Sequence, residues 1–184
     1  MAYRLGPRAL IPLLALVIVG GILGSIVLSY NSLTTKDQTV TAQWAQVENE
    51  YQRKINLIPT LVSIARNYTQ FERSVLENIT RLRSAWLNAS GLEQRINVST
   101  ELDQNLFLIR ATYEAYPELQ SQQIVQNLMF SLEGTENRIA TERMRYNEAV
   151  RVFNTSIATF PNVLWSGGFG FRARPYFDPI PGGP

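Results

Sequence analysis

Residues 121–161 constrain the fold most, because they contain one glycine, Gly134, and no proline before Pro161. One face of this stretch repeats mostly at steps of three and four, which is the spacing of an amphipathic α-helix. That face is formed by Ile124, Leu128, Leu132, Thr135, Ile139, Tyr146, Val150, Phe153, Ile157 and Phe160. A helix of about 40 residues spans roughly 60 Å. We therefore expect the long helix of an elongated bundle.

Three earlier segments also have helical spacing. Residues 36–58 predict a helix, continuous with or following the apolar N-terminal segment, that Pro59 breaks or kinks. Residues 61–86 carry apolar side chains at alternating steps of three and four, which predicts a second helix beginning near Pro59. Residues 102–116 predict a third, shorter helix. No strand-like alternation occurs before residue 161, so the sequence predicts an all-α antiparallel bundle.

The N-terminal segment, residues 9–28, is almost wholly apolar and lies in a run without charge between Arg8 and Lys36. About twenty such residues cross the hydrocarbon core of a bilayer as a helix, so we expect a transmembrane helix over residues 9–30. A cleaved secretory signal is the alternative. The apolar run is longer than a typical signal region, and no clean small-x-small cleavage site precedes the polar residues.

The charges around this span predict its orientation. Arg4 and Arg8 precede it, whereas Lys36 and Asp37 cancel after it. The positive-inside rule then places residues 1–8 in the cytoplasm and the helical domain in an extracytoplasmic space, which includes an organelle lumen or a virion exterior.

Small residues inside the span are spaced for close helix packing. They form two small-xxx-small pairs, Gly20 with Gly24 and Gly21 with Ser25. Glycine is common in transmembrane helices, so the pairs are also compatible with a single helix in lipid.

Composition excludes several function classes. The chain has no cysteine and no histidine, which removes thiol nucleophiles, disulfides and the commonest general base and metal ligand. Beyond Arg4 and Arg8, the remaining 15 basic residues balance 15 acidic ones without any basic run, so nucleic-acid binding is not expected. No cofactor or metal is predicted.

Polar residues interrupt the apolar face of the long stretch; they are Glu133, Glu136, Asn137, Arg143, Asn147 and Asn154. Buried polar layers fix the register between antiparallel helices, and we favour this interpretation. The alternative is a groove of carboxylates and amides that holds a cation or a ligand.

The stretch after residue 161 has a different composition. Residues 161–184 hold five glycines and five prolines, so the tail predicted over residues 162–184 is irregular. Its aromatic and basic residues suit a subunit interface or the membrane–water boundary, whereas a disordered end is the alternative. These residues are Trp165, Phe169, Phe171, Arg172, Arg174, Tyr176 and Phe177.

Five N-x-S/T motifs follow the span, at Asn67, Asn78, Asn88, Asn97 and Asn154. The first four are candidate glycosylation acceptors, although chance also explains the number. Asn154 is expected to point inward, which makes it a poor acceptor.

The sequence resembles the LemA family over nearly its whole length. The resemblance rests on motifs in register: residues 30–33 (YNSL), Trp44, residues 51–62 (YQRKINLIPTLV), 114–119 (EAYPEL), 132–139 (LEGTENRI), Arg143, 146–147 (YN), Val150, 153–154 (FN), 160–161 (FP), 169–171 (FGF) and 176–177 (YF). It implies a membrane anchor followed by a mostly four-helix bundle over residues 31–161, with no established reaction and a role in membrane-associated scaffolding. Family members commonly have His-Glu where this chain has Phe71 and Glu72, so no role of that histidine carries over.

Together these observations favour a non-catalytic, single-pass membrane protein. It is expected to act as a scaffold or accessory subunit of a homo-oligomer or a larger membrane protein complex, with its tail docked on neighbours. A sensor or ligand-binding ectodomain that acts through a partner protein is the second hypothesis. An enzyme that uses carboxylates alone is the third.

Overall fold

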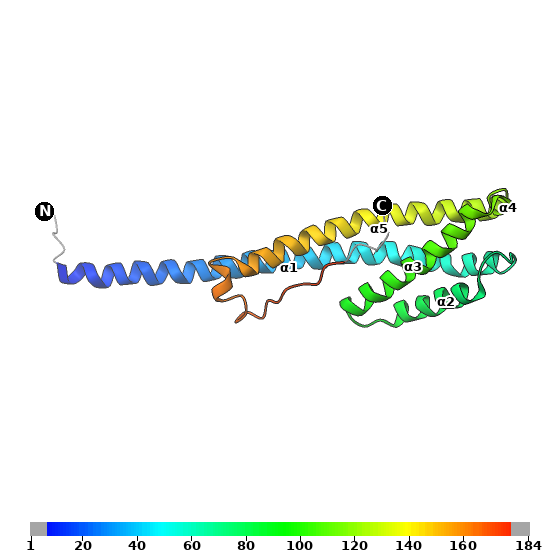
Figure 1. Ribbon diagram of the computed structural model, residues 1–184. Helices are drawn as coiled ribbons and strands as arrows, with labels where there is room; N and C mark the ends of the chain where they lie inside the picture. Colours follow the sequence, from blue (N-terminus) through cyan, green and yellow to red (C-terminus); the bar gives the residue numbers. More distant parts are fainter. Residues whose placement is uncertain (1–6, 178–184) are drawn as a thin grey trace. The chain divides into compact units, whose positions relative to one another are not determined.

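The computed structural model describes residues 7–177, with side chains from residue 11 onward (Figure 1). Residues 1–6 of the predicted cytoplasmic segment and residues 178–184 of the predicted tail lie outside the described residues. The described chain contains six helices and no strand: α1 (Pro7–Ala65), α2 (Arg73–Asn88), α3 (Leu92–Ala115), α4 (Pro117–Gln120), α5 (Gln123–Ala158) and the 3-10 helix η1 (Asn162–Leu164). The all-α prediction is confirmed.

The chain forms two compact units. The first comprises Met1–Thr41 and Glu148–Arg174, and the second comprises Ala42–Asn147 and Pro175–Pro184. Helices α1 and α5 therefore contribute residues to both units, which are described separately below.

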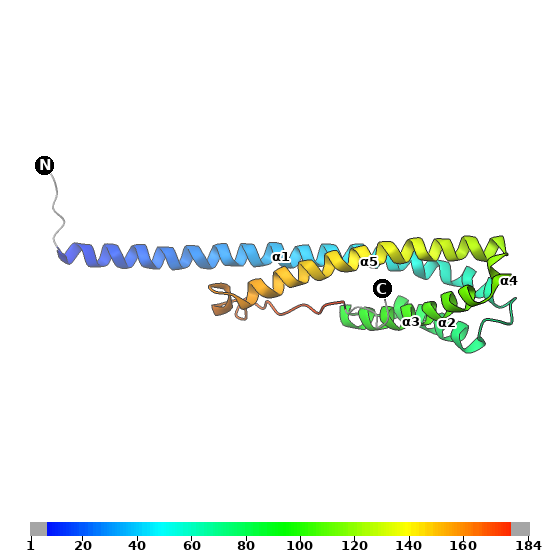
Figure 2. The same ribbon diagram turned by 45° about the horizontal axis from the view of Figure 1, so that its top comes forward.

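The second unit is a four-helix bundle formed by parts of α1 and α5 together with α2 and α3. Ion pairs join Lys54 to Glu136 and Glu50 to Arg138, so α1 and α5 run antiparallel. Their side-by-side course is visible in two views (Figures 1 and 2). Short connections after α1 and α2 reverse the chain each time, which gives an up-down-up-down bundle.

Buried residues confirm most of the predicted helix faces. The face of α1 from Val40 to Ile58 is buried apart from Trp44, which is half-buried, and the face of α5 is buried from Leu128 to Phe153. The prediction is wrong at both ends of the α5 face, because Ile124 is 58% exposed and Phe160 is 78% exposed. Val125 is buried in place of Ile124.

The predicted break at Pro59 is wrong, because α1 continues to Ala65. A proline inside a helix removes one hydrogen bond and strains the preceding turn. Here Ile58 and Leu61 are almost fully buried on either side of the exposed Pro59, and burial of apolar area offsets that cost.

The predicted second and third helices also differ from the structure. The apolar seam of residues 61–86 is divided between the end of α1, a connector at residues 66–72 and α2. Helix α3 is longer than α2, not shorter, because the buried residues Ile96 and Ser99 continue its inner face before Leu102. Ser121, the first residue of the long stretch, is the C-cap of α4, and α5 begins at Gln123.

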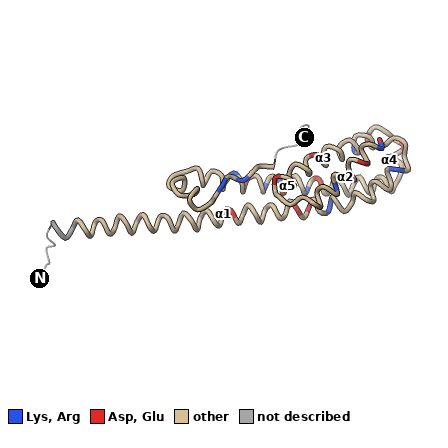
Figure 3. The backbone as a smooth tube through the Cα atoms, turned by 90° about the horizontal axis from the view of Figure 1, so that it is seen from below, with Lys and Arg blue, Asp and Glu red and all other residues tan. Residues whose placement is uncertain are grey.

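The first unit begins with the apolar part of α1. This helix is long and apolar enough to cross a membrane by length and composition, and residues 11–35 of it contain no Lys, Arg, Asp or Glu (Figure 3). The large apolar side chains from Ile11 to Leu28 are exposed, apart from Ile26, which is half-buried. In a soluble unit they would be left in water, whereas lipid would solvate them.

The segment after α5 packs on α1 within the first unit. The Tyr30 ring lies 5.1 Å from that of Phe169 and 6.0 Å from that of Phe171, measured between centroids. Gly170 joins these two phenylalanines with φ of 82°, a conformation that glycine adopts without strain. Both Arg174 nitrogens that contact Asp37 lie within 3.0 Å of its carboxylate.

Candidate functional site

A buried charged cluster occupies the centre of the bundle unit. The Asp103 carboxylate on α3 accepts hydrogen bonds from the Tyr51 hydroxyl at 2.6 Å, the Lys54 ammonium at 2.8 Å and the Arg143 guanidinium at 3.2 Å. Tyr51 and Lys54 come from α1, and Arg143 comes from α5. One aspartate therefore ties three helices together.

The cluster balances its charges. Lys54 also lies 3.4 Å from Glu136, whose side chain is one-third exposed, so two cations face two carboxylates. Lys54, Asp103 and Arg143 are 1%, 5% and 9% exposed. Buried charges are tolerated when they are paired and hydrogen-bonded, and the contacts of Lys54, Asp103 and Arg143 meet that condition.

Phe177, a residue of the tail, covers this cluster. Its ring stacks on Tyr51 with planes 8° apart and centroids 5.9 Å apart, and it lies 6.3 Å from Trp44. The Arg143 guanidinium carbon lies 3.9 Å from the centre of the same ring, which is a cation–π arrangement. Phe177 is 1% exposed, so this tail residue belongs to the core of its own chain.

Burial and the neighbouring Asp103 carboxylate raise the pKa of Tyr51 well above its ordinary value of 10.0. The neutral phenol is therefore the form that the folded bundle holds. The unfolded chain releases this proton at lower pH than the folded chain, so stability is lost as pH rises above about 10.

We expect Tyr51→Phe to reduce the loss of melting temperature between about pH 8 and about pH 11. The variant is less stable than the wild type at the lower pH, because the hydrogen bond to Asp103 is absent. Thermal unfolding of the detergent-solubilised full chain measures both quantities. Tyr176→Phe is the exposed control, and identical slopes for wild type and Tyr51→Phe would refute the assignment.

Asn147 and Asn154 hold the backbone of the tail, each in its own unit. In the bundle unit, the Asn147 amide donates to the Phe177 carbonyl and accepts from the Phe177 N–H, both at 2.8 Å. In the first unit, Asn154 pairs in the same way with Arg174, at 2.9 and 2.8 Å. Each amide thus satisfies one backbone donor and one acceptor of an extended chain that has no strand partner.

We expect Asn147→Leu to lower the free energy of unfolding by about 1–3 kcal/mol, because both polar groups of the Phe177 backbone lose their partner. Asn137→Leu on the exposed face of α5 is the matched control. Denaturant unfolding monitored by circular dichroism compares them. Equal effects of the two substitutions would show that the Asn147 pairing contributes no specific stability.

The other predicted polar residues do not join one site. Glu133 and Asn137 are exposed, whereas Glu136 is half-buried beside Lys54. Glu133 and Glu136 line a small depression of about 70 Å³ with Arg110 and Tyr113, but Asn147 does not line it. Asn147 therefore does not share this depression with the two glutamates. Among the described residues, no group of three or more acidic side chains could hold a metal ion.

Lys54 and Asp103 are central to the cluster but were not among the predicted site residues. Lys54 lies three residues after Tyr51 and four before Ile58, which is the spacing of the α1 seam. Asp103 follows Ser99 by four and precedes Leu106 by three. The sequence therefore contains a signal for this ion pair, because a lysine and an aspartate occupy seam positions on two different helices.

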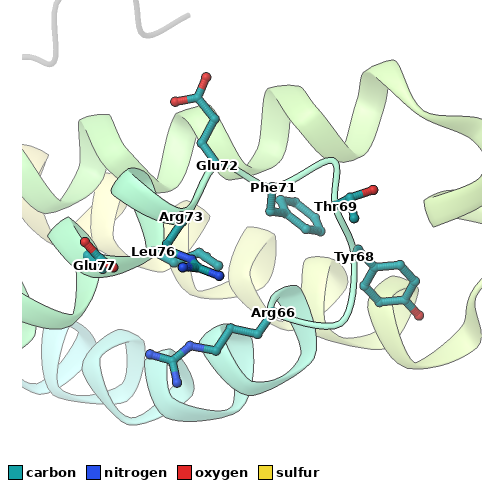
Figure 4. A pocket seen from close by; sticks show the side chains of 8 residues that line it. All are labelled: Arg66, Tyr68, Thr69, Phe71, Glu72, Arg73, Leu76 and Glu77. Carbon is teal, nitrogen blue, oxygen red and sulfur yellow. The ribbon is translucent and has the colours of Figure 1, made fainter.

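The largest surface depression of those described, about 660 Å³, lies beside the connector between α1 and α2. Its lining includes Arg66, Phe71 and Glu72, together with Tyr68 (Figure 4). The side chains of Glu72 and Tyr68 point away from each other in that view. The lining does not present a convergent set of charged groups, so we assign no ligand to it.

The remaining predicted residues are placed as follows. An added Cβ at Gly20, Gly21 or Gly24 would meet no atom within 4 Å, so this face of the span is open. The side chain of Ser25 bonds within its own helix, to the Ile22 carbonyl. Four sequon asparagines are exposed, namely Asn67, Asn78, Asn88 and Asn97, whereas Asn154 is half-buried and paired with the tail.

The predicted interface residues of the tail divide into two groups. Phe169, Phe171, Arg174 and Phe177 contact their own chain, whereas Arg172 and Tyr176 are exposed and Trp165 is half-buried. Deletion of residues 162–184 would remove a core residue, Phe177, and would therefore test folding as well as docking.

Comparison with known proteins gives a family and three relatives. The LemA family model matches residues 43–181. Magnetosome protein MamQ 2 and Magnetosome protein MamQ 1 of Paramagnetospirillum magneticum are each 25% identical to this chain over 204 residues, covering 97% of it and 75% of each relative. Magnetosome protein MamQ of Magnetospirillum gryphiswaldense is 23% identical with the same coverage.

Proposed function

This chain belongs to the LemA family, as predicted, and on that premise we propose that it is a non-catalytic, membrane-anchored structural subunit of a larger membrane assembly. The apolar start of α1 is the anchor. The helical bundle is the part that contacts other proteins. In this proposal residues 1–8 are cytoplasmic and the bundle is extracytoplasmic, as the flanking charges favour.

The observation that carries the proposal is the closed Asp103 cluster. The only strongly buried charges of the described bundle, on Lys54, Asp103 and Arg143, bind one another and hold three helices together. A catalytic site needs reactive groups that face a substrate. In this cluster the same residues are covered by Phe177 and serve the packing of the bundle.

The relatives support membership in an assembly, because they are named as magnetosome proteins. A sensor or ligand-binding role has less support. Glu133 and Glu136 line only a small depression, and the Asn147 side chain binds the Phe177 backbone.

The subunit contacts remain part of the proposal. We assign one contact to the open small-residue face of the span, formed by Gly20, Gly24, Gly21 and Ser25. The exposed tail residues Arg172 and Tyr176 are candidates for a second.

The test is cross-linking in native membranes followed by mild detergent extraction and native mass spectrometry of the full chain. We expect the chain in the carbonate-washed membrane fraction and in particles larger than one chain. Gly20→Ile with Gly24→Ile should reduce the share of large particles, and Val19→Ile with Ile26→Val on the opposite face is the control. A monomer without cross-linked neighbours would overturn the scaffold role, and release by carbonate would overturn the anchor.

A further inference from the structure

Three large apolar side chains are exposed just after α5, in the unit that contains the apolar part of α1. Phe160, Val163 and Leu164 are 78%, 51% and 64% exposed. They come from a compact turn and from the short helix η1, and they are not part of a helix face that packs on another helix. We call these three residues the apolar knuckle.

The knuckle belongs to a well-structured turn. The Ser166 N–H bonds to the Asn162 carbonyl at 2.8 Å, and the Ser166 hydroxyl bonds to the Ile157 carbonyl at 3.2 Å. The Asn162 amide bonds to the Ser156 carbonyl at 3.0 Å. The fold therefore holds these apolar side chains outward, and their exposure is a property of an ordered segment.

The same turn is tied to the end of the apolar segment of α1. Phe169 contacts Tyr30, which lies two residues beyond Leu28, the last residue of the apolar run. Figure 1 shows the segment after α5 lying beside α1 in this region. If residues 9–28 cross the hydrocarbon core, Tyr30 and its aromatic neighbours lie where the membrane–water interface begins.

The charges of the turn also fit this location. Residues 159–174 contain no acidic side chain, and their two basic residues are Arg172, which is exposed, and Arg174, which pairs with Asp37. Apolar and aromatic side chains beside an exposed arginine are typical of segments that bind the interfacial region of a bilayer.

We propose that Phe160, Val163 and Leu164 insert into the lipid headgroup–acyl boundary of the bilayer that α1 crosses, as a second attachment to the membrane. This inference rests on the proposed membrane anchor. The bilayer is the occupant that the structure favours, because Phe169 of the same turn contacts Tyr30, two residues beyond the apolar run of the proposed anchor.

The chain has no cysteine, so single labels are specific. An environment-sensitive dye is attached to Val163→Cys, Ile18→Cys or Met144→Cys in the full chain, reconstituted in vesicles of phosphatidylcholine and phosphatidylglycerol. Two further preparations use phosphatidylcholine brominated near the headgroup end of its acyl chains, to reach residue 163, or near their methyl end, to reach residue 18 in the middle of the span. We expect the dye at 163 to lose about half of its emission or more in the brominated vesicles, and the dye at 144, on the exposed face of the bundle, to change little.

The dye at residue 18 distinguishes a failure of the knuckle insertion from a failure of the membrane anchor. Quenching at 18 without quenching at 163 would overturn the knuckle insertion and leave the anchor intact. No quenching at 18 would overturn the anchor and with it this inference. The dye at 163 could also be shielded from iodide in water without being quenched by brominated lipid. That result would show that a protein, such as a second copy, covers the knuckle. It also rejects the proposal. All three sites are exposed, so the substitutions leave the core unchanged.

Discussion

Replacing Asp103 by asparagine is expected to lower the free energy of unfolding by about 3–5 kcal/mol, because the two buried cations Lys54 and Arg143 lose the carboxylate that they share. Lys54 and Arg143 both donate to this carboxylate and are at most 9% exposed. For a chain of this size we expect a melting temperature about 10 °C lower, or a larger decrease. Thermal unfolding of the detergent-solubilised full chain, followed by circular dichroism, measures it.

Two comparison variants distinguish the effect of breaking the buried ion pairs from the effect of removing one negative charge. Glu148→Gln removes a carboxylate from an exposed pair with Arg151 and should leave the melting temperature unchanged. Lys54→Met with Asp103→Asn also removes one of the two buried cations and should recover part of the loss. A melting temperature for Asp103→Asn equal to that of Glu148→Gln would mean that the cluster does not stabilise the bundle.

Phe177→Ala is expected to cost about 3–5 kcal/mol of unfolding free energy, the range for truncating a buried phenylalanine. The ring is 1% exposed and lies against Tyr51, Trp44 and Arg143. Its removal leaves a cavity beside a buried cation and opens the cluster to water. Equilibrium denaturation by urea gives the stability, and the transition midpoint should fall with little change in slope.

The neighbouring residue is the matched control for this prediction. Tyr176→Ala truncates an aromatic ring that is 44% exposed and should cost less than half as much. Phe177→Ala and Asp103→Asn should not be additive, since Phe177 covers the Arg143 that binds Asp103. Equal losses for Tyr176→Ala and Phe177→Ala would place the tail outside the core.

Much of the fold follows from helical spacing alone. The all-α class, the long C-terminal helix and the buried face of α1 from Val40 to Ile58 were predicted. The connector at residues 66–72 was missed because its apolar residues, including Phe71, keep the spacing of a helix although the chain leaves the helix there. Periodicity reports which residues are buried, and it does not report where the backbone hydrogen bonds stop.

The site was predicted only in part. Arg143, Asn147 and Asn154 were identified as polar residues on the inner side of α5, because they interrupt an apolar face. Their partners could not be found from spacing, since Asp103 lies on another helix and the Phe177 backbone lies in the tail. Asn147 and Asn154 are seven residues apart and so share one helix face, but a shared face does not say which backbone reaches it.

The contacts of the tail also could not be predicted from residue spacing. Its aromatic residues predicted an attachment, and sequence alone does not distinguish the chain's own core from a neighbour or a bilayer. Phe177 is buried in its own bundle, whereas Phe160, just before Pro161, is exposed. The difference comes from tertiary position, because both are phenylalanines close to a proline in the sequence.

Hydrogen–deuterium exchange of the full chain in lipid nanodiscs tests the central claim most directly, that the tail is part of the fold and completes the buried cluster. The Phe177 and Arg174 amides each donate to an asparagine side chain, so we predict that a peptide covering residues 172–177 exchanges much more slowly than an unstructured chain. Asn147→Leu should abolish the protection at Phe177. Exchange of this peptide at the rate of an unstructured chain would contradict the account.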